Sequence, residues 1–141
     1  MLDPFGTAAD RFRLPATGPT DDMHPGWPES TPFVRLPASA VFPSGARMRL
    51  RPLLRSDGHE WRRQRIEDES FLRSVEPTQA APWAAAHSQQ AWWNHLMYLR
   101  TAAREALVVP LVIEVEGQFV GQITLGNIQH GSIRDCWIGY W

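Results

Sequence analysis

The sequence contains no lysine, a single cysteine and no long apolar run. Because all fourteen basic residues are arginines, lysine chemistry such as a Schiff base is ruled out. Cys136 has no second thiol for a disulfide or a shared metal ion, and its apolar neighbours predict an inert buried thiol. No segment approaches the ~18 consecutive apolar residues of a membrane span. Residues 1–10 also lack the basic and apolar regions of a signal peptide, so the expected compartment is cytoplasmic.

The charges likewise lack a dominant sign. Fourteen arginines and 15 acidic residues leave a net charge of -1, and 43% of the residues are hydrophobic. A nucleic-acid-binding protein normally shows a basic total or a basic stripe, so no nucleic-acid partner is expected, and no membrane partner either. A chain of 141 residues is long enough for one domain with one sizeable core.

Most signatures of catalysis are also missing, among them the Walker loop, HExxH, GxSxG, CxxC and GxGxxG. The histidines are scattered, and His87 and His95 are too far apart on one predicted helix to share an ion, so no metal site is expected. Residues 55–60 resemble a phosphate-binding loop, since they follow a predicted strand and open a predicted helix. Asp57 and Glu60 would repel a pyrophosphate there, and we expect no phosphate site.

Eight of the twelve prolines lie in residues 1–45. Proline at that density excludes regular ladders and predicts an N-terminal arm, followed by a domain over residues 46–141. We expect few contacts from residues 1–24. Residues 27–41 contain Trp27 and Phe33 among other apolar side chains, which predicts that they lie against the domain in extended form.

Alternation of arginine with apolar residues predicts a first strand over 47–54. A helix follows to about Asp68, capped by Ser56 or Asp57, with Trp61 and Ile66 facing inward. After a broken stretch over 71–83, Ser88 opens a longer helix to about Glu105. One apolar face of that helix is formed by residues at helical spacing, namely Trp92, Leu96, Leu99 and Ala103.

The next segment predicts a β-hairpin. Two β-branched, alternating runs at 109–116 and 118–126 flank the turn signal Glu116-Gly117. A loop over 127–132 and a last strand over 133–141 complete the pattern. The predicted fold class is therefore α+β, with four mostly antiparallel strands and two or three helices between the first and the second.

Residues 110–128 and 137–141 resemble the second, third and fourth strands of RimJ/RimL-type N-acetyltransferases of the GNAT superfamily. Residues 49–53 with Asp57 and Trp61 are similar to that family's first strand and first helix. Residues 76–78 with Trp83 stand where the family carries a substrate-side loop. The resemblance covers roughly residues 25–141 and implies the N-terminal half of a GNAT fold, because the family's Gly-rich pyrophosphate loop comes after the fourth strand.

The resemblance implies acetyl-CoA as cosubstrate and a protein N-terminus or another primary amine as acceptor. It places Ile138, Gly139, Tyr140 and Trp141 along the pantetheine arm. It places Trp83, Asn127 and Trp137 around the acceptor amine, and the catalytic residues remain unknown. Because the pyrophosphate loop is missing, we expect the chain alone to be inactive.

Two alternatives stay open beside an incomplete transferase domain: a non-catalytic fragment that binds a partner at most through its exposed sheet edge, and an interaction module that uses the proline-rich arm. In the isolated chain, residues 133–141 would form an open sheet edge with unpaired backbone groups and no charge over 136–141. This predicts self-association through the strand, with unusual exposure of Trp141.

Overall fold

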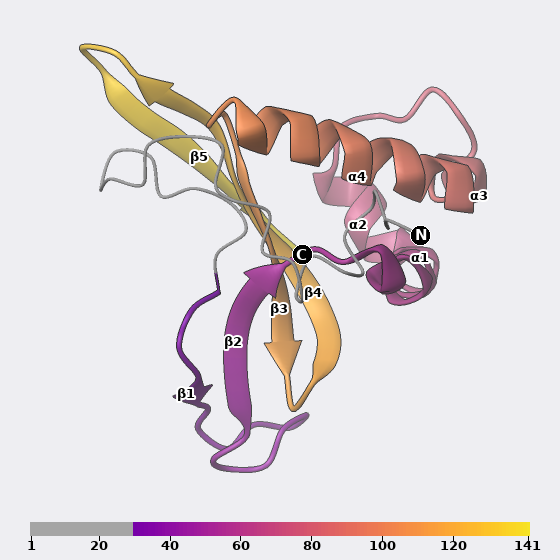
Figure 1. The fold of residues 1–141 in the computed structure, drawn as a ribbon. Coiled ribbons are helices and arrows are strands. Elements are labelled where there is room, and N and C mark those ends of the chain that lie inside the picture. Colours follow the sequence, from indigo (N-terminus) through magenta and orange to yellow (C-terminus); the bar gives the residue numbers. More distant parts are fainter. Residues whose placement is uncertain (1–29) are drawn as a thin grey trace, which may run out of the picture.

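A computed structural model describes residues 30–141 of the chain. In this part of the chain, five antiparallel strands form one sheet in the order β1-β2-β3-β4-β5. They are β1 (Val34–Arg35), β2 (Arg47–Pro52), β3 (Val109–Val115), β4 (Gln118–His130) and β5 (Arg134–Tyr140). Between β2 and β3 come the short turn η1 (Arg55–Asp57) and the helices α1 (Gly58–Glu67), α2 (Glu69–Val75), α3 (Trp83–Ala86) and α4 (Gln89–Arg104). Figure 1 shows these helices gathered on one side of the sheet, which confirms the α+β class.

The strand that the sequence did not predict, β1, belongs to the proline-rich arm. Val34 pairs with Met48 and Arg35 with Arg47, and the Thr31 N–H donates to Leu50 O at 2.9 Å. The Arg47 guanidinium lies over the Phe33 ring, 4.0 Å from the centroid of that ring. The extended docking is thus confirmed for residues 31–36, whereas residues 39–42 form a turn and Val41 is 78% exposed. The expectations for residues 1–24 and for Trp27 lie outside the described residues.

The β3–β4 hairpin forms at the predicted turn. Glu116 and Gly117 both have positive φ, 49° and 79°, as a two-residue hairpin turn requires. The predicted loop over 127–132 is wrong, because β4 continues to His130 and pairs with β5. The strand absorbs a register shift between Gly126 and Gln129, where Asn127 adopts φ 50°. Such a bulge lets a strand bend without ending.

The longest helix, α4, has the predicted start and the predicted buried face. The Ser88 hydroxyl accepts a hydrogen bond from the Ala91 N–H at 3.2 Å, which caps the helix. The residues of the predicted apolar face are all buried, and they pack with Leu53, Trp61, Val112 and Phe119 into one core. None of the described helices is both long and apolar enough to cross a bilayer.

Three details of the helical region differ from the predictions. The predicted broken stretch over 71–83 overlaps α2 as far as Val75 and ends where α3 begins, so the described chain has four helices between β2 and β3 rather than two or three. Ile66 is 42% exposed, and Arg65 takes the inward position with Glu76 as its partner. Asp57 does not cap α1, since its carboxylate accepts from the Leu54 N–H at 2.7 Å and from Arg51.

A buried charge network ties β2, β3 and η1 together. Arg51 donates to both Asp57 oxygens, at 2.9 and 2.8 Å, and also to Glu114, which Arg49 reaches at 2.7 Å. Burial alone would raise the pKa of Glu114, but the hydrogen bonds from Arg49 and Arg51 lower it below its usual value. Glu114 is therefore ionised, and both carboxylates of the network are paired with arginines, as buried polar groups require.

Candidate functional site

A cavity of about 460 Å³ lies between the helices and the β4–β5 end of the sheet. Its sheet side is formed by Gln122 and Thr124 of β4 together with residues 137–141. Its helical side comes from Arg65 of α1, Leu72 and Val75 of α2, the following residues Glu76 and Pro77, and His95 of α4. The cavity therefore joins segments that are more than 70 residues apart in sequence.

Arg65 is the cation at the centre of the helical side. It donates to Glu76 at 2.6 Å and lies 4.5 Å from the ring centroid of Trp141. Its Nη1 is also 3.3 Å from His87 Nε2, while His87 Nδ1 is 2.8 Å from the Trp83 carbonyl oxygen. A carbonyl only accepts, so His87 carries its proton on Nδ1 and accepts from Arg65 through Nε2. Burial lowers the pKa of Arg65 from its ordinary value, although Glu76 opposes that effect.

His95 and Gln122 face the cavity from opposite sides. Burial, followed by the positive charge of Arg65, lowers the pKa of His95 to about 4, and the nearby Gln122 side chain offsets part of that effect. The imidazole is therefore neutral at pH 7. Among the described residues, no hydrogen-bond partner meets His95 Nε2, Gln122 Oε1 or Arg65 Nε, although all three atoms are buried.

Unpartnered buried polar atoms are rare in folded proteins and call for an explanation. Here three of them belong to residues that line one cavity whose other walls are largely apolar. An apolar cleft with a few convergent polar groups is the usual form of a small-molecule site. The cavity can therefore accept a ligand that combines an apolar chain with hydrogen-bonding groups.

The four residues predicted along the pantetheine arm, Ile138, Gly139, Tyr140 and Trp141, all line this cavity, as does Trp137. The Trp137 indole lies across Gly126 and Gly139, and a Cβ on Gly126 would overlap its ring. Glycine at this position thus lets the ring lie along the sheet. Trp137 remains 53% exposed, so its ring is available at the surface.

Trp83 and Asn127, predicted near the acceptor amine, do not line the cavity. Trp83 is buried, and its Nε1 donates to the Arg65 carbonyl oxygen at 2.7 Å, which places it beneath the Arg65 cluster. Asn127 is exposed at the bulge of β4. The structure thus joins five of the seven predicted residues around one cavity.

The edge strand β5 is largely exposed, with Ile138 at 60% and Tyr140 at 77%. Cys136 is also exposed, so the predicted buried thiol is wrong: the side chains of this apolar run face solvent rather than a core. Trp141 is half-buried rather than unusually exposed, because it packs against Phe119 and Arg65. The described part of the arm pairs at the opposite edge of the sheet, through β1.

Arg65, His95 and Gln122 were not identified from the sequence as site residues, and Glu76 was placed only as part of the substrate-side loop. For Arg65 the sequence did offer a signal: it follows the inward-facing Trp61 by four residues, so both lie on the same face of α1. His95 and Gln122 are 27 positions apart on different elements, and no local pattern joins them. Among the described residues, no three metal-ligating side chains converge.

Comparisons with known proteins place the fold. The chain is similar to Mycobacterium smegmatis RimJ, solved in complex with CoA-disulfide, with 37% identity, a TM-score of 0.72 and coverage of 82% of this chain. It is also similar in fold to RimL, a ribosomal L7/L12 alpha-N-protein acetyltransferase solved in complex with coenzyme A, with 17% identity, a TM-score of 0.54 and coverage of 67% of this chain.

The chain spans about half of each of these proteins, 52% of RimJ and 50% of RimL. A scan of protein-family models gives no match, and a search of curated proteins gives none either.

Proposed function

This chain belongs to the RimJ/RimL type of GNAT-superfamily N-acetyltransferases, and we propose that it forms the acceptor-side and pantetheine-side part of an enzyme that transfers acetyl from acetyl-CoA to a protein N-terminal or other primary amine. The observation that carries this proposal is the cavity beside β5, whose lining includes Arg65, His95 and Gln122, three residues that each have a buried polar atom without a hydrogen-bond partner. Both similar structures contain coenzyme A, in agreement with acetyl-CoA as the cosubstrate of the family. The cytoplasmic location stays a prediction.

The reaction needs a neutral amine that attacks the thioester carbonyl, followed by expulsion of the CoA thiolate. An α-amino group with a pKa near ~8 needs only modest help to lose its proton. A neutral His95 can accept a hydrogen bond from that amine, but a pKa of about 4 makes it a poor proton acceptor at pH 7. We therefore assign no general base, and the catalytic residues stay unknown.

Ile138, Gly139, Tyr140 and Trp141 are proposed to hold the pantetheine arm. Among the described strands β5 pairs only with β4, so its other edge offers backbone N–H and C=O groups to the amides of pantetheine. A backbone N–H at this edge would polarise the thioester carbonyl as it gains negative charge. The apolar side chains at this end of the cavity suit the alkyl portions of the same arm.

The acceptor side is proposed to include Trp137 on the cavity wall. Trp83 and Asn127 do not line the cavity and would contribute from a greater distance. Trp83 would act through Arg65, because its indole N–H is bonded to the Arg65 carbonyl. Asn127 lies at the bulge of β4, outside the cavity, so it would contact only a part of the acceptor that extends out of the cavity. Glu76, whose charge is balanced by Arg65, is proposed to accept a hydrogen bond from the acceptor ammonium group before that group loses its proton.

The chain alone is proposed to be catalytically incomplete. Its coverage of 52% of RimJ supports this, as does the absence of a phosphate-binding loop motif in its sequence. Charge-assisted hydrogen bonds to phosphate are among the strongest a protein makes, and one strand edge cannot replace them. We expect no turnover by the chain alone and no acetyl-CoA affinity tighter than millimolar. The alternative, a non-catalytic interaction module that self-associates through β5, is supported by the exposed Ile138 and Tyr140.

Nuclear magnetic resonance of the 15N-labelled chain tests the proposal. Acetyl-CoA and S-acetylpantetheine, which lacks the nucleotide and pyrophosphate, should shift the same amides at residues 122–124 and 137–141 with similar millimolar affinity. Shifts elsewhere, or micromolar binding of acetyl-CoA alone, would contradict it. Mixing the chain with the part of M. smegmatis RimJ that it does not match then tests for acetylation of a peptide amine by mass spectrometry. Acetylation by the mixture but by neither part alone separates an incomplete transferase from a non-catalytic module.

A further inference from the structure

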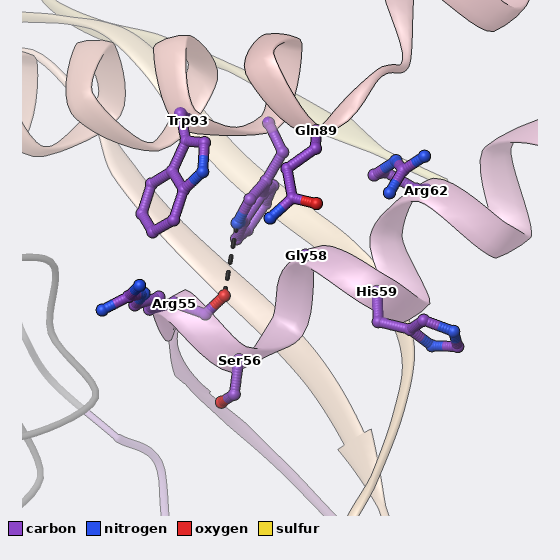
Figure 2. A pocket seen from close by; sticks show the side chains of 8 residues that line it. Arg55, Ser56, Gly58, His59, Arg62, Gln89 and Trp93 are labelled. Atoms are coloured by element: carbon purple, nitrogen blue, oxygen red, sulfur yellow. Dashed lines mark hydrogen bonds between the residues drawn. The ribbon is translucent and has the colours of Figure 1, made fainter.

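A second cavity, of about 360 Å³, lies between the start of α1 and the start of α4 (Figure 2). Arg55, Ser56, His59 and Arg62 form one side, and Gln89 and Trp93 form the other. Figure 2 shows Arg55 and Arg62 at opposite ends of this space, with the Gln89 amide between them. It shares no lining residue with the cavity beside β5.

Every ionisable side chain that lines this second cavity is basic. The sequence argued against an anion at residues 55–60 because Asp57 and Glu60 carry negative charge there. In the structure both carboxylates are paired with arginines that do not line this cavity. Asp57 is buried against Arg51, and Glu60 receives two hydrogen bonds from Arg63, at 3.0 and 2.7 Å. Glu60 also lies 3.1 Å from His59 Nδ1, which reduces the contribution of His59. Arg62 is therefore the main charge at its end of the cavity.

Arg62 is held in place by one hydrogen bond and keeps its terminal nitrogens for a ligand. Its Nε donates to the His87 carbonyl oxygen at 3.2 Å. Within residues 30–141 no hydrogen bond or ion pair engages its Nη1 or Nη2, and the same holds for the side-chain amide of Gln89. A guanidinium anchored through Nε presents two parallel donors, which match the two oxygens of a carboxylate.

The opposite end of the cavity offers an aromatic surface. The Arg55 guanidinium lies 4.9 Å from the ring centroid of Trp93, and the Trp92 N–H donates to the Arg55 carbonyl at 3.3 Å. Indole surfaces contact the apolar stems and peptide planes of polypeptides. The cavity thus has Arg62 at one end and the Trp93 indole, with the Arg55 guanidinium over its ring, at the other.

We propose that this cavity binds an acidic segment of a polypeptide, with a glutamate or aspartate carboxylate on Arg62 and Gln89 and the adjoining peptide against Trp93. A nucleic acid is disfavoured because a long polyanion would meet Glu60, Glu67 and Glu69 along α1 and α2, and the chain carries a net charge of -1. The binding does not depend on acetyl transfer.

The test is titration of the 15N-labelled full chain with a short peptide that contains glutamate and aspartate and is acetylated at its N-terminus and amidated at its C-terminus. The blocked amine keeps this probe from serving as an acceptor in the cavity beside β5. We expect shifts at residues 55–62 and 89–93, with affinity that falls as salt is raised. The matched peptide with glutamine and asparagine should bind at least tenfold more weakly.

Two variants and one control locate the contact. Arg62→Gln should weaken binding about tenfold, because the variant loses the positive charge and the paired donors of the guanidinium; a tenfold change corresponds to ~1.4 kcal/mol. Gln89→Ala, at an exposed position, should weaken it a few-fold without affecting folding. Arg73→Gln removes an equal charge from the exposed surface of α2 and should leave the affinity unchanged.

Equal binding of the amide peptide, or unchanged affinity in both Arg62→Gln and Gln89→Ala, would overturn the proposal. A single-stranded oligonucleotide that bound the same residues more tightly would do the same, in favour of nucleic acid. Inorganic phosphate that bound as tightly as the peptide would reduce the site to one for a simple oxyanion.

Discussion

The strands β3 and β5 have the same length, seven residues each, and lie in the same sheet, but their surroundings are opposite. β3 pairs with β2 and β4, and its Val112 and Val115 are 0% and 2% exposed. Among the described strands β5 pairs with β4 alone, and its Ile138 and Tyr140 are 60% and 77% exposed. Both strands are rich in β-forming residues, so intrinsic propensity does not distinguish them.

The difference separates what holds the fold from what serves the site. β3 contributes side chains to the core and Glu114 to the buried charge network. β5 contributes little burial but supplies the backbone edge and the apolar surface beside the cavity. Side chains that stay exposed on an edge strand add little to stability, so substitutions in the two strands should differ widely in their effect on the free energy of unfolding.

The largest effect is expected from Glu114→Gln in β3. Removing one member of a buried charge network leaves Arg51 and Arg49 without full compensation, and such changes cost about 3–5 kcal/mol. Urea unfolding followed by circular dichroism measures the loss. Glu69→Gln, which removes an exposed i,i+4 ion pair with Arg73, is the control and should be nearly neutral. Equal losses in both variants would show that the network contributes no more than a surface pair.

The cavity beside β5 should make stability depend on pH through His95. The folded-state pKa of about 4 lies below the ~6.5 of an unfolded histidine. Between these values the unfolded chain binds more protons, so this contribution is complete above pH ~6.5 and is lost as the pH falls toward 4. The full difference corresponds to ~3 kcal/mol.

Urea midpoints measured from pH 4 to 7.5 for the chain and for His95→Gln test this contribution. The variant should lose less stability across the interval. His87, whose pKa burial also lowers, is present in both proteins, so the difference isolates His95. Parallel curves would mean that His95 titrates normally.

A matched pair of truncations compares the two strands directly. Val112→Ala should cost about 2 kcal/mol, since it removes two buried methyl groups and leaves a void. Ile138→Ala removes more carbon but from an exposed position, and should change stability by less than about 0.5 kcal/mol. If Ile138→Ala proved as costly as Val112→Ala, β5 would have to be buried in solution, and self-association is the first explanation to examine.

The smallest change in stability, with the clearest change in association, is expected for Ile138→Lys. A charge on an edge strand disfavours pairing with a second copy. Light scattering of the chain should show concentration-dependent association that the variant reduces, while its unfolding midpoint stays close to that of the parent. Tyr98→Lys, at a 66% exposed position on α4, is the control for added charge. A parent chain that stays monomeric at high concentration would contradict self-association through β5.

Much of the fold was predictable because its signals are local. The Glu116-Gly117 turn between two alternating runs specifies the hairpin, and Ser88 with the stripe Trp92, Leu96, Leu99 and Ala103 specifies α4. Each of these features depends on residues close in sequence, where turn geometry, capping and helical period act directly. The resemblance carried by residues 110–128 and 137–141 extended this to the family and to residues that line the cavity beside β5.

Only the tertiary structure decided where the charged and polar groups point. Asp57 could have capped α1 or faced an anion, but Arg51 holds its carboxylate in a buried network. Cys136 reads as buried in sequence but lies on an exposed strand. His95 and Gln122 become neighbours only when α4 packs on the sheet. The energy of such a group depends on burial and on partners that are distant in sequence, so the residue types at these positions were known from the sequence while their roles were not.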